Sequence, residues 1–205
     1  MGRRINLLEK GRLAKQINFI IEVDKLKSVY RQTSLIDKSR RENDAEHSWH
    51  LLILAMLLNE YANDDSLDIS RVMQMVAIHD IVEIDAGDTF AYDRDKNQAD
   101  KLKKEREGAK RIFALLPKDQ GQNLYNLWEE FEEQQTPEAK FASALDRIQP
   151  LLHNYYTQGG TWLEHNVDLD SVIERFKDVA KASKILGQLV DHIIKDSIKR
   201  GYIKK

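Results

Sequence analysis

Apolar residues that recur at spacings of three and four, rather than two, dominate this 205-residue chain and constrain its fold more than any other feature. Only three prolines and nine glycines are present, so few positions interrupt a helix. The pattern predicts an all-α protein with no significant sheet, a helical bundle in which residues 1–205 form a single domain. The expected helices cover residues 6–30, 45–62, 71–86, 98–116, 118–134 and 137–157, with one or two more within 169–200.

Local features refine the expected helices. Asp44 suits the N-cap of the second helix, because its side chain can accept the free amide protons of a first turn. Residues 51–58 are almost all apolar, so we expect them to be deeply buried. Gly87 suits the end of the third helix, and residues 85–97 should form a polar loop beside it. The first helix should bury one apolar stripe, made of Leu13, Ile17, Ile20, Ile21, Leu26 and Val29.

The composition excludes several classes of protein. Without cysteine there is no disulfide, iron–sulfur cluster, zinc–thiolate site or thiol nucleophile, so His, Asp and Glu must hold any metal ion. The formal net charge of -2 argues against a chain that coats nucleic acid or anionic lipid. We find no signal-peptide pattern and no run of about 18 apolar residues. We therefore expect a soluble, cytoplasmic protein that binds neither nucleic acid polymers nor membranes.

Ionisable residues that interrupt apolar helical runs are the candidates for chemistry. His79, Asp80 and Glu83 end one such run. Asp146 interrupts another. Burying these charges is costly unless they are paired or bound to a metal. On an α-helix Glu83 shares a face with both His79 and Asp80. With His47 from the second helix, two imidazoles and two carboxylates suit a divalent first-row metal that keeps open positions for water and a substrate oxygen.

Purely structural roles for the same side chains are also consistent with the sequence. A buried ion pair that only stabilises the fold would also place His79 next to Asp80. His50, three residues after His47, could ligate a metal together with it. The acidic run at residues 129–133 is typical of a solvated helix face. The tryptophans suit a core or an interface, and they are Trp49, Trp128 and Trp162.

Three motifs follow one another in a fixed order: Glu46-His47-Ser48, then His79-Asp80-x-x-Glu83 with Gly87-Asp88, then Ala144-Leu145-Asp146. This order resembles the H…HD…D signature of the HD-domain phosphohydrolase superfamily. Within the superfamily, residues 40–48 (RRENDAEHS) and 127–132 (LWEEFE) look like the branch that contains bacterial 5′-deoxynucleotidases and eukaryotic HD-domain-containing protein 2. The likeness covers roughly residues 10–160, with the core motifs in 31–150 and the C-terminal helices in 169–200 beyond it.

The resemblance implies a metal centre and a catalytic residue. The ligands of one divalent ion, which could be Mn, Co, Fe, Ni, Zn or Mg, would be His47, His79, Asp80 and Asp146. Glu83 matches the family's catalytic glutamate. Asp88 matches an acidic residue near the sugar, which implies a catalytic and a substrate-binding role.

Two arginines would complete the substrate site that the resemblance implies. Arg31 lies in the region where the deoxynucleotidases carry an arginine that faces the substrate phosphate. Arg40 would be a second phosphate ligand. Gln32 stands where those enzymes have a tryptophan next to the sugar.

The implied activity is metal-dependent hydrolysis of small-molecule nucleoside 5′-monophosphates, as in a 5′-deoxynucleotidase, with a metal-activated water attacking the 5′-phosphate. One alternative is an HD phosphohydrolase that acts on a cyclic nucleotide, a guanosine polyphosphate or a nucleoside triphosphate. Another is a non-catalytic helical interaction module that a metal stabilises. The family also implies a homodimer, and a C-terminal apolar stripe could pack within the domain or across a two-fold axis. The stripe consists of Ile185, Leu186, Leu189, Val190, Ile193 and Ile194.

Overall fold

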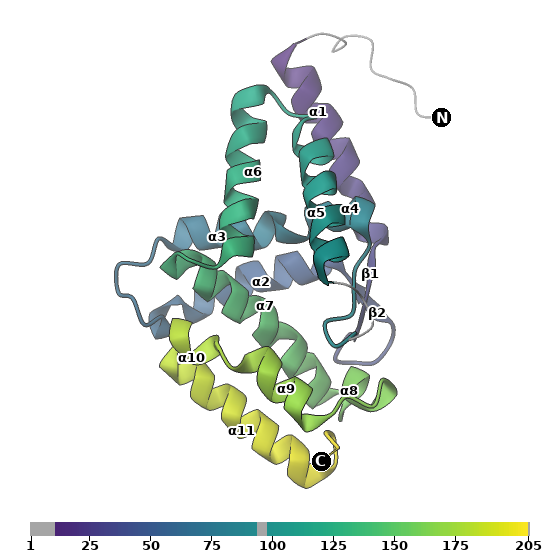
Figure 1. The fold of residues 1–205 in the computed structure, drawn as a ribbon, viewed down its shortest axis with the longest axis vertical. Helices are drawn as coiled ribbons and strands as arrows, with labels where there is room; N and C mark the ends of the chain where they lie inside the picture. Colours follow the sequence, from purple (N-terminus) through teal and green to yellow (C-terminus); the bar gives the residue numbers. More distant parts are fainter. Residues whose placement is uncertain (1–10, 94–97, 205) are drawn as a thin grey trace.

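The computed structural model describes residues 11–93 and 98–204, which form layers of helices with one small hairpin (Figure 1). The parts of the expected first helix and polar loop at residues 1–10 and 94–97 lie outside the described residues. In chain order the elements are α1 (Arg12–Val23), the 3₁₀ helix η2 (Asp24–Ser28), β1 (Tyr30–Ser34), β2 (Arg41–Asn43), α2 (Asp44–Leu58), η3 (Asn59–Tyr61), α3 (Ile69–Ile78), η4 (His79–Val82), α4 (Glu83–Ala86), α5 (Gln98–Phe113), α6 (Lys118–Glu133), α7 (Pro137–Tyr156), α8 (Gly160–Glu164), α9 (Leu169–Phe176), α10 (Val179–Ala182) and α11 (Lys184–Arg200). The all-α prediction is confirmed, with β1 and β2 as a small antiparallel addition.

Helices α2, α3 and α7 form the centre of the molecule. They lie across the middle of Figure 1 and pack against one another, with α1, α5 and α6 above them and α9 to α11 below. Leu51, Met75, Leu145 and Ile148 come from these three helices and are fully buried. Because such interiors are close-packed, side chains that the central helices carry are held in fixed positions.

Local signals set the ends of several helices. Asp68 caps α3 by accepting a hydrogen bond from the amide of Arg71, so this helix begins slightly earlier than expected. Thr136 caps α7, and Pro137 occupies its first turn. Gly87 ends α4 with φ of 74°, a conformation that glycine tolerates and other residues rarely adopt. The expected end of this helical segment at Gly87 is therefore present.

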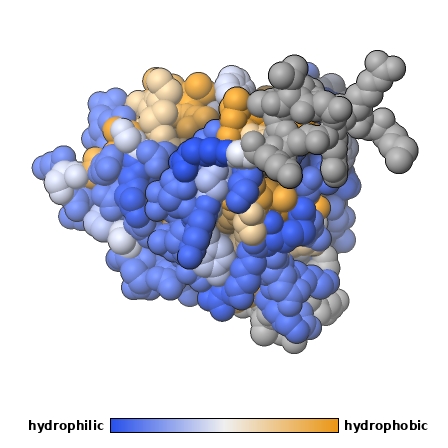
Figure 2. All heavy atoms as spheres, turned by 90° about the horizontal axis from the view of Figure 1, so that it is seen from above, coloured by the Kyte–Doolittle hydropathy of each residue, from blue (hydrophilic) through white to orange (hydrophobic). Residues whose placement is uncertain are grey.

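Two helices expose apolar side chains that we expected to be buried. In α1, Leu13, Ile20 and Ile21 face solvent, because this helix lies at the outer edge of the molecule beside α5. In α2, Met56 and Leu57 are 56% and 65% exposed, because only the opposite face of this helix packs against α3 and α7. Figure 2 shows apolar patches of this kind on a face that is otherwise largely hydrophilic.

The C-terminal apolar stripe packs within the domain. Leu186, Val190, Ile193 and Ile194 are buried, and α11 contacts α7 and α10. Ile185 stays half exposed. The stripe is therefore mainly core. Among the described helices, none is both long enough and apolar enough to span a bilayer.

Candidate metal centre

A capping box at the start of α2 orients His47. Asn43, not Asp44, is the N-cap: its side chain accepts a hydrogen bond from the Glu46 amide at 3.0 Å, and the Glu46 carboxylate accepts one from the Asn43 amide at 3.3 Å. Asp44 is instead the first residue of the helix and is wholly buried, as is His47. The spacing of Asn43 and Glu46 is the sequence signal that identifies this cap.

Helix α3 ends immediately before the His79-Asp80 pair. Residues 79–82 form η4, so a single α-helix does not continue to Gly87 as expected. A 3₁₀ helix advances about 120° per residue instead of about 100°, which changes the directions of the two side chains. The His79 Nδ1–H group donates to the backbone carbonyl of Val76 at 3.0 Å. This hydrogen bond leaves the Nε2 atom of His79 facing Asp80.

Four side chains from three elements meet at one point. The Nε2 atom of His47, on α2, lies 3.0 Å from Asp146 Oδ1 on α7 and 3.9 Å from Asp80 Oδ2. The Nε2 atom of His79 lies 3.1 Å from Asp80 Oδ1 and 3.6 Å from Asp146 Oδ1. Donor atoms of His47, His79 and Asp80 all lie within 4.8 Å of one another. The structure thus brings together the four residues expected as metal ligands.

The hydrogen bonding of this cluster shows that a cation fits it. Because the Nδ1 proton of His79 goes to a carbonyl, the Nε2 atom of the neutral imidazole is an acceptor. This atom is buried, has no hydrogen-bond partner among the described residues, and faces a second acceptor, Asp80 Oδ1. Two acceptors at this distance repel each other unless positive charge lies between them. Two imidazoles and two carboxylates are also a suitable donor set for divalent first-row metals.

The pKa values of His47 and Asp146 also indicate that the cluster favours a positive charge. Burial and Arg31 oppose protonation of His47, but its hydrogen bond with Asp146 and the nearby carboxylates of Glu42 and Asp80 together outweigh them and raise the pKa of His47 to about 9. Burial alone would raise the pKa of Asp146, yet its hydrogen bond with His47 and the proximity of His79 hold that pKa well below its ordinary value. The cluster therefore favours positive charge at its centre, and a divalent ion would supply it.

The cluster lies at the wall of a cavity of about 590 Å³, a volume typical of small-molecule sites. Glu83 is buried beside Asp80, and its Oε2 atom has no hydrogen-bond partner among the described residues. Burial, followed by the charges of Asp80, Asp88 and Asp44, raises the pKa of Glu83 well above its ordinary value. Asp88 lines the same cavity, and burial raises its pKa too. Both carboxyls favour a proton or a cation next to them.

Of the two expected phosphate ligands, Arg31 reaches the cavity and Arg40 does not. The Nη1 atom of Arg31 lies 2.9 Å from Asp80 Oδ2 and 3.3 Å from Asp44 Oδ1. Burial opposes the charge of Arg31, but the surrounding carboxylates, Asp80 foremost, together outweigh this effect and raise the pKa of the guanidinium. Arg40 is 49% exposed, forms a two-point ion pair with Glu46, and is absent from the described lining of the cavity. The geometry gives no support to the role expected of Arg40.

Sequence reasoning missed other charged side chains in the cavity wall, among them Lys101, Glu105, Glu132 and Arg175. Glu132 belongs to the acidic run expected on a solvated face, yet burial raises its pKa to about 7. Its position four residues after the buried Trp128 was the available signal, because such residues share a helix face. Arg175 lies 3.4 Å from Asp146, and no local pattern marks it, because α9 reaches the site by packing against α7.

The protein is thus a helical domain that gathers two histidines and two aspartates from three elements, a candidate metal centre at the wall of a cavity of ligand size. The HD domain model matches residues 23–186, which is most of the chain. This protein belongs to the HD domain family, and the resemblance drawn from the motifs is confirmed.

Named relatives and solved structures share this fold. The human protein 5′-deoxynucleotidase HDDC2 is 33% identical over 137 residues, which cover 66% of this chain and 65% of the relative. The mouse protein of the same name is 32% identical over 148 residues and 71% of each chain. A predicted metal-dependent phosphohydrolase from Magnetospirillum magnetotacticum MS-1 is 50% identical, with a TM-score of 0.89 over 95% of this chain and 96% of that chain. A conserved hypothetical protein from Pyrococcus furiosus shares the fold at 20% identity, with a TM-score of 0.62 over 89% of this chain and 99% of that chain.

Proposed function

We propose that this protein is a metal-dependent phosphomonoesterase that hydrolyses nucleoside 5′-monophosphates, with 5′-deoxynucleotides as its substrates. The observation that carries the proposal is the meeting of His47, His79, Asp80 and Asp146 at the cavity wall, with the Glu83 carboxyl beside them. The names of the human and mouse relatives support the activity. The phosphohydrolase description of the Magnetospirillum protein supports the reaction class.

The residues of the site match the demands of phosphate ester hydrolysis. The anionic oxygens of a phosphate monoester repel nucleophiles, so the site must neutralise their charge. A divalent ion held by the four ligands would supply positive charge and lower the pKa of a water molecule. Arg31 adds a charged guanidinium, fixed by two carboxylates, that would hold phosphate oxygens. Glu83 would take a proton from the water or pass one to the leaving 5′ oxygen.

The remaining cavity wall suits a nucleoside. Asp88 lines the cavity and would accept a hydrogen bond from a sugar hydroxyl. Phe90 and Tyr92, with ring centroids 5.4 Å apart, provide aromatic surface for a sugar or base. Gln32 and Thr33 of β1 add polar groups. This wall combines apolar surface with a few polar contacts, as small-molecule sites do.

The proposal is tested by measuring phosphate release with Mn²⁺ or Co²⁺ from a panel of nucleotides. The panel contains deoxynucleoside and ribonucleoside 5′-monophosphates, cyclic nucleotides, guanosine polyphosphates and nucleoside triphosphates. We expect the highest kcat/KM with 5′-deoxynucleoside monophosphates. Turnover of another class alone would assign the protein to that substrate. A protein that binds the metal but hydrolyses no member of the panel would refute the proposed activity.

We also propose that the protein works as a homodimer in the cytoplasm, where nucleotides are metabolised. Because the stripe of α11 is used within the domain, the two-fold contact needs another apolar face. Trp49, Met56 and Leu57 offer one, since they are exposed and share one side of α2. Light scattering should give twice the mass of one chain, and cell fractionation should recover the protein with cytoplasmic markers. A monomer at all concentrations would contradict the dimer.

A further inference from the structure

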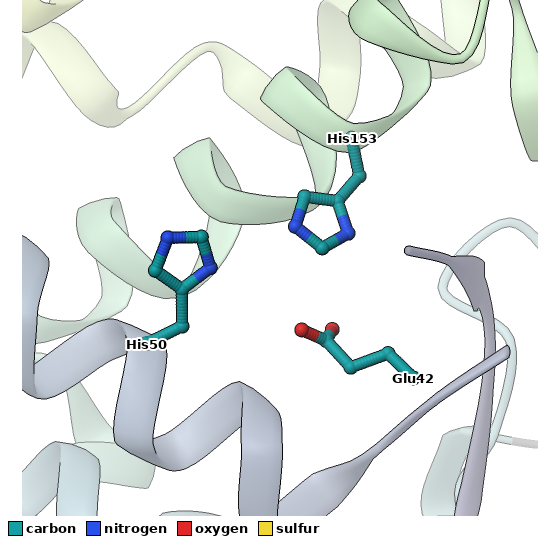
Figure 3. Close-up of side chains that lie close together, drawn as sticks. All are labelled: Glu42, His50 and His153. Carbon is teal, nitrogen blue, oxygen red and sulfur yellow. The ribbon is translucent and has the colours of Figure 1, made fainter. Parts of the chain in front are cut away.

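Glu42 of β2, His50 of α2 and His153 of α7 lie close together (Figure 3). One ligand atom of each lies within 4.8 Å of the others, and by composition the three resemble a metal site. However, the Nε2 atom of Gln149 lies 2.7 Å from Glu42 Oε1, 3.3 Å from His50 Nδ1 and 3.2 Å from His153 Nε2. An amide group therefore fills the space between the three side chains.

The partners of His153 and Glu42 determine which way this amide points. The Nδ1 atom of His153 lies 3.1 Å from the backbone carbonyl of Ser34, which can only accept, so Nδ1 carries the proton. Burial lowers the pKa of His153, so the ring is neutral and its Nε2 atom accepts. The Glu42 carboxylate also only accepts. The atom of Gln149 that faces them must therefore be the NH₂ group, and its carbonyl oxygen must point the other way.

The carbonyl oxygen of Gln149 points to the metal centre. It lies 3.1 Å from the Nδ1 atom of His47. A carbonyl accepts, so His47 carries a proton on Nδ1, and Nε2, the atom that faces Asp146, is the one left to bind a metal ion. Gln149 is fully buried, so no solvent molecule can replace either side of this chain of hydrogen bonds.

We propose that Gln149 is a positioning residue that selects the metal-binding tautomer of His47, and that Glu42 and His153 hold its amide in the required orientation by accepting its two N–H groups. The inference rests on the proposed role of His47 as a metal ligand. It also implies that the β1–β2 hairpin influences metal binding, because Ser34 and Glu42 fix the orientation of the Gln149 amide. Loss of such a partner of a ligating histidine typically weakens metal binding about 10–100-fold.

The first test replaces Gln149 by Met, a side chain of similar length without hydrogen-bonding groups. We expect the dissociation constant of Mn²⁺, measured by competition with a chelator, to rise about 10–100-fold. Gln188→Met makes the same chemical change at an exposed position of α11 and should leave Mn²⁺ affinity unchanged. Wild-type Mn²⁺ affinity in a folded Gln149→Met protein would overturn the proposal.

A double-mutant cycle separates positioning from a general loss of packing. Glu42→Leu should weaken Mn²⁺ binding in the wild type but add little in the Gln149→Met background, because Glu42 acts through Gln149. Independent, additive losses would overturn the proposal, since Glu42 Oε2 would then reach His47 Nδ1 directly across their 3.7 Å separation. Glu42→Gln keeps an acceptor oxygen and should retain most of the affinity.

A measurement on the unmodified protein keeps the proposal testable if the variants fail to fold. Nitrogen-15 NMR of the histidine-labelled wild type, loaded with Zn²⁺, should show His153 as the single tautomer protonated at Nδ1. A His153 protonated at Nε2 would overturn the chain of hydrogen bonds. The two proposals also fail separately. If the protein hydrolyses no nucleotide but Gln149→Met weakens Mn²⁺ binding as expected, only the proposed activity is refuted. If the protein hydrolyses nucleotides but Gln149→Met leaves Mn²⁺ affinity unchanged, only the role of Gln149 is refuted.

Discussion

Arg31 counterbalances three buried carboxylates, so the Arg31→Met substitution tests whether this charge balance stabilises the fold. The methionine keeps much of the apolar stem but removes the charge. In the wild type, Nη1 lies 2.9 Å from Asp80 and 3.3 Å from Asp44, and Nε lies 4.0 Å from Glu42. These carboxylates are at most 10% exposed, so water cannot replace the lost guanidinium.

The expected loss follows from these distances. Each attraction is about 4–6 kcal/mol at an effective dielectric constant of about 20, and desolvation offsets most of it. Removing one partner of a buried pair has a net cost of about 3–5 kcal/mol. For a chain of this size, that cost lowers the melting temperature by roughly 6–20 °C. The loss should be smaller near pH 5.5 than near pH 8, because burial and Asp80 already raise the pKa of Asp44 to about 7, and protonation removes its charge.

The assay is thermal unfolding of metal-free protein, followed by circular dichroism. Arg40→Met is the matched control, since Arg40 is also paired with a glutamate but is half exposed, and its loss should change the melting temperature little. Added Mn²⁺ should restore part of the stability of Arg31→Met, because it supplies positive charge to the same carboxylates. Equal, small losses in the two variants would refute the conclusion that buried charge balance stabilises this site.

Three further predictions concern the metal and the acidic groups. Asp80→Ala should abolish Mn²⁺ binding and turnover together, whereas Glu83→Gln should lower kcat about 10²–10⁴-fold with metal still bound, as steady-state kinetics and metal analysis would show. Full activity in Glu83→Gln would contradict the proton-transfer role. Chelation with EDTA should stop turnover and lower the melting temperature, and Mn²⁺ or Co²⁺ should reverse both, because an ion present at 100 times its dissociation constant stabilises the fold by about 2.7 kcal/mol. Glu132 binds its proton more tightly in the folded state, because burial raises its pKa from the ordinary value to about 7. Its ionisation therefore removes stability as pH rises from about 4.5 to about 7, so metal-free Glu132→Gln should gain up to about 3 kcal/mol at pH 8 and Glu133→Gln should not, in urea unfolding at several pH values.

The helices were predictable because their signals are local. The three-and-four spacing of apolar residues, Thr136-Pro137 before α7 and Gly87 after α4 all act within a few turns of the chain. The β1–β2 hairpin was missed because its strands are very short and are stabilised by each other. The pairing of Tyr30 with Asn43 leaves no periodic pattern in either strand. The 3₁₀ geometry of η4 was missed for a similar reason, since its residues would also fit an α-helix.

The candidate site, like the fold, was predictable from the sequence only in part. By itself the sequence determined that His79, Asp80 and Asp146 interrupt apolar helices, because burying a charge is so costly that each such position stands out in the residue order. The order of the motifs added His47 to them. Only the tertiary structure decided which side chains meet. It brought Glu132 into the cavity wall and left Arg40 outside it. It also placed Gln149 against His47, 102 positions away, and residue order alone does not specify which helix faces pack together.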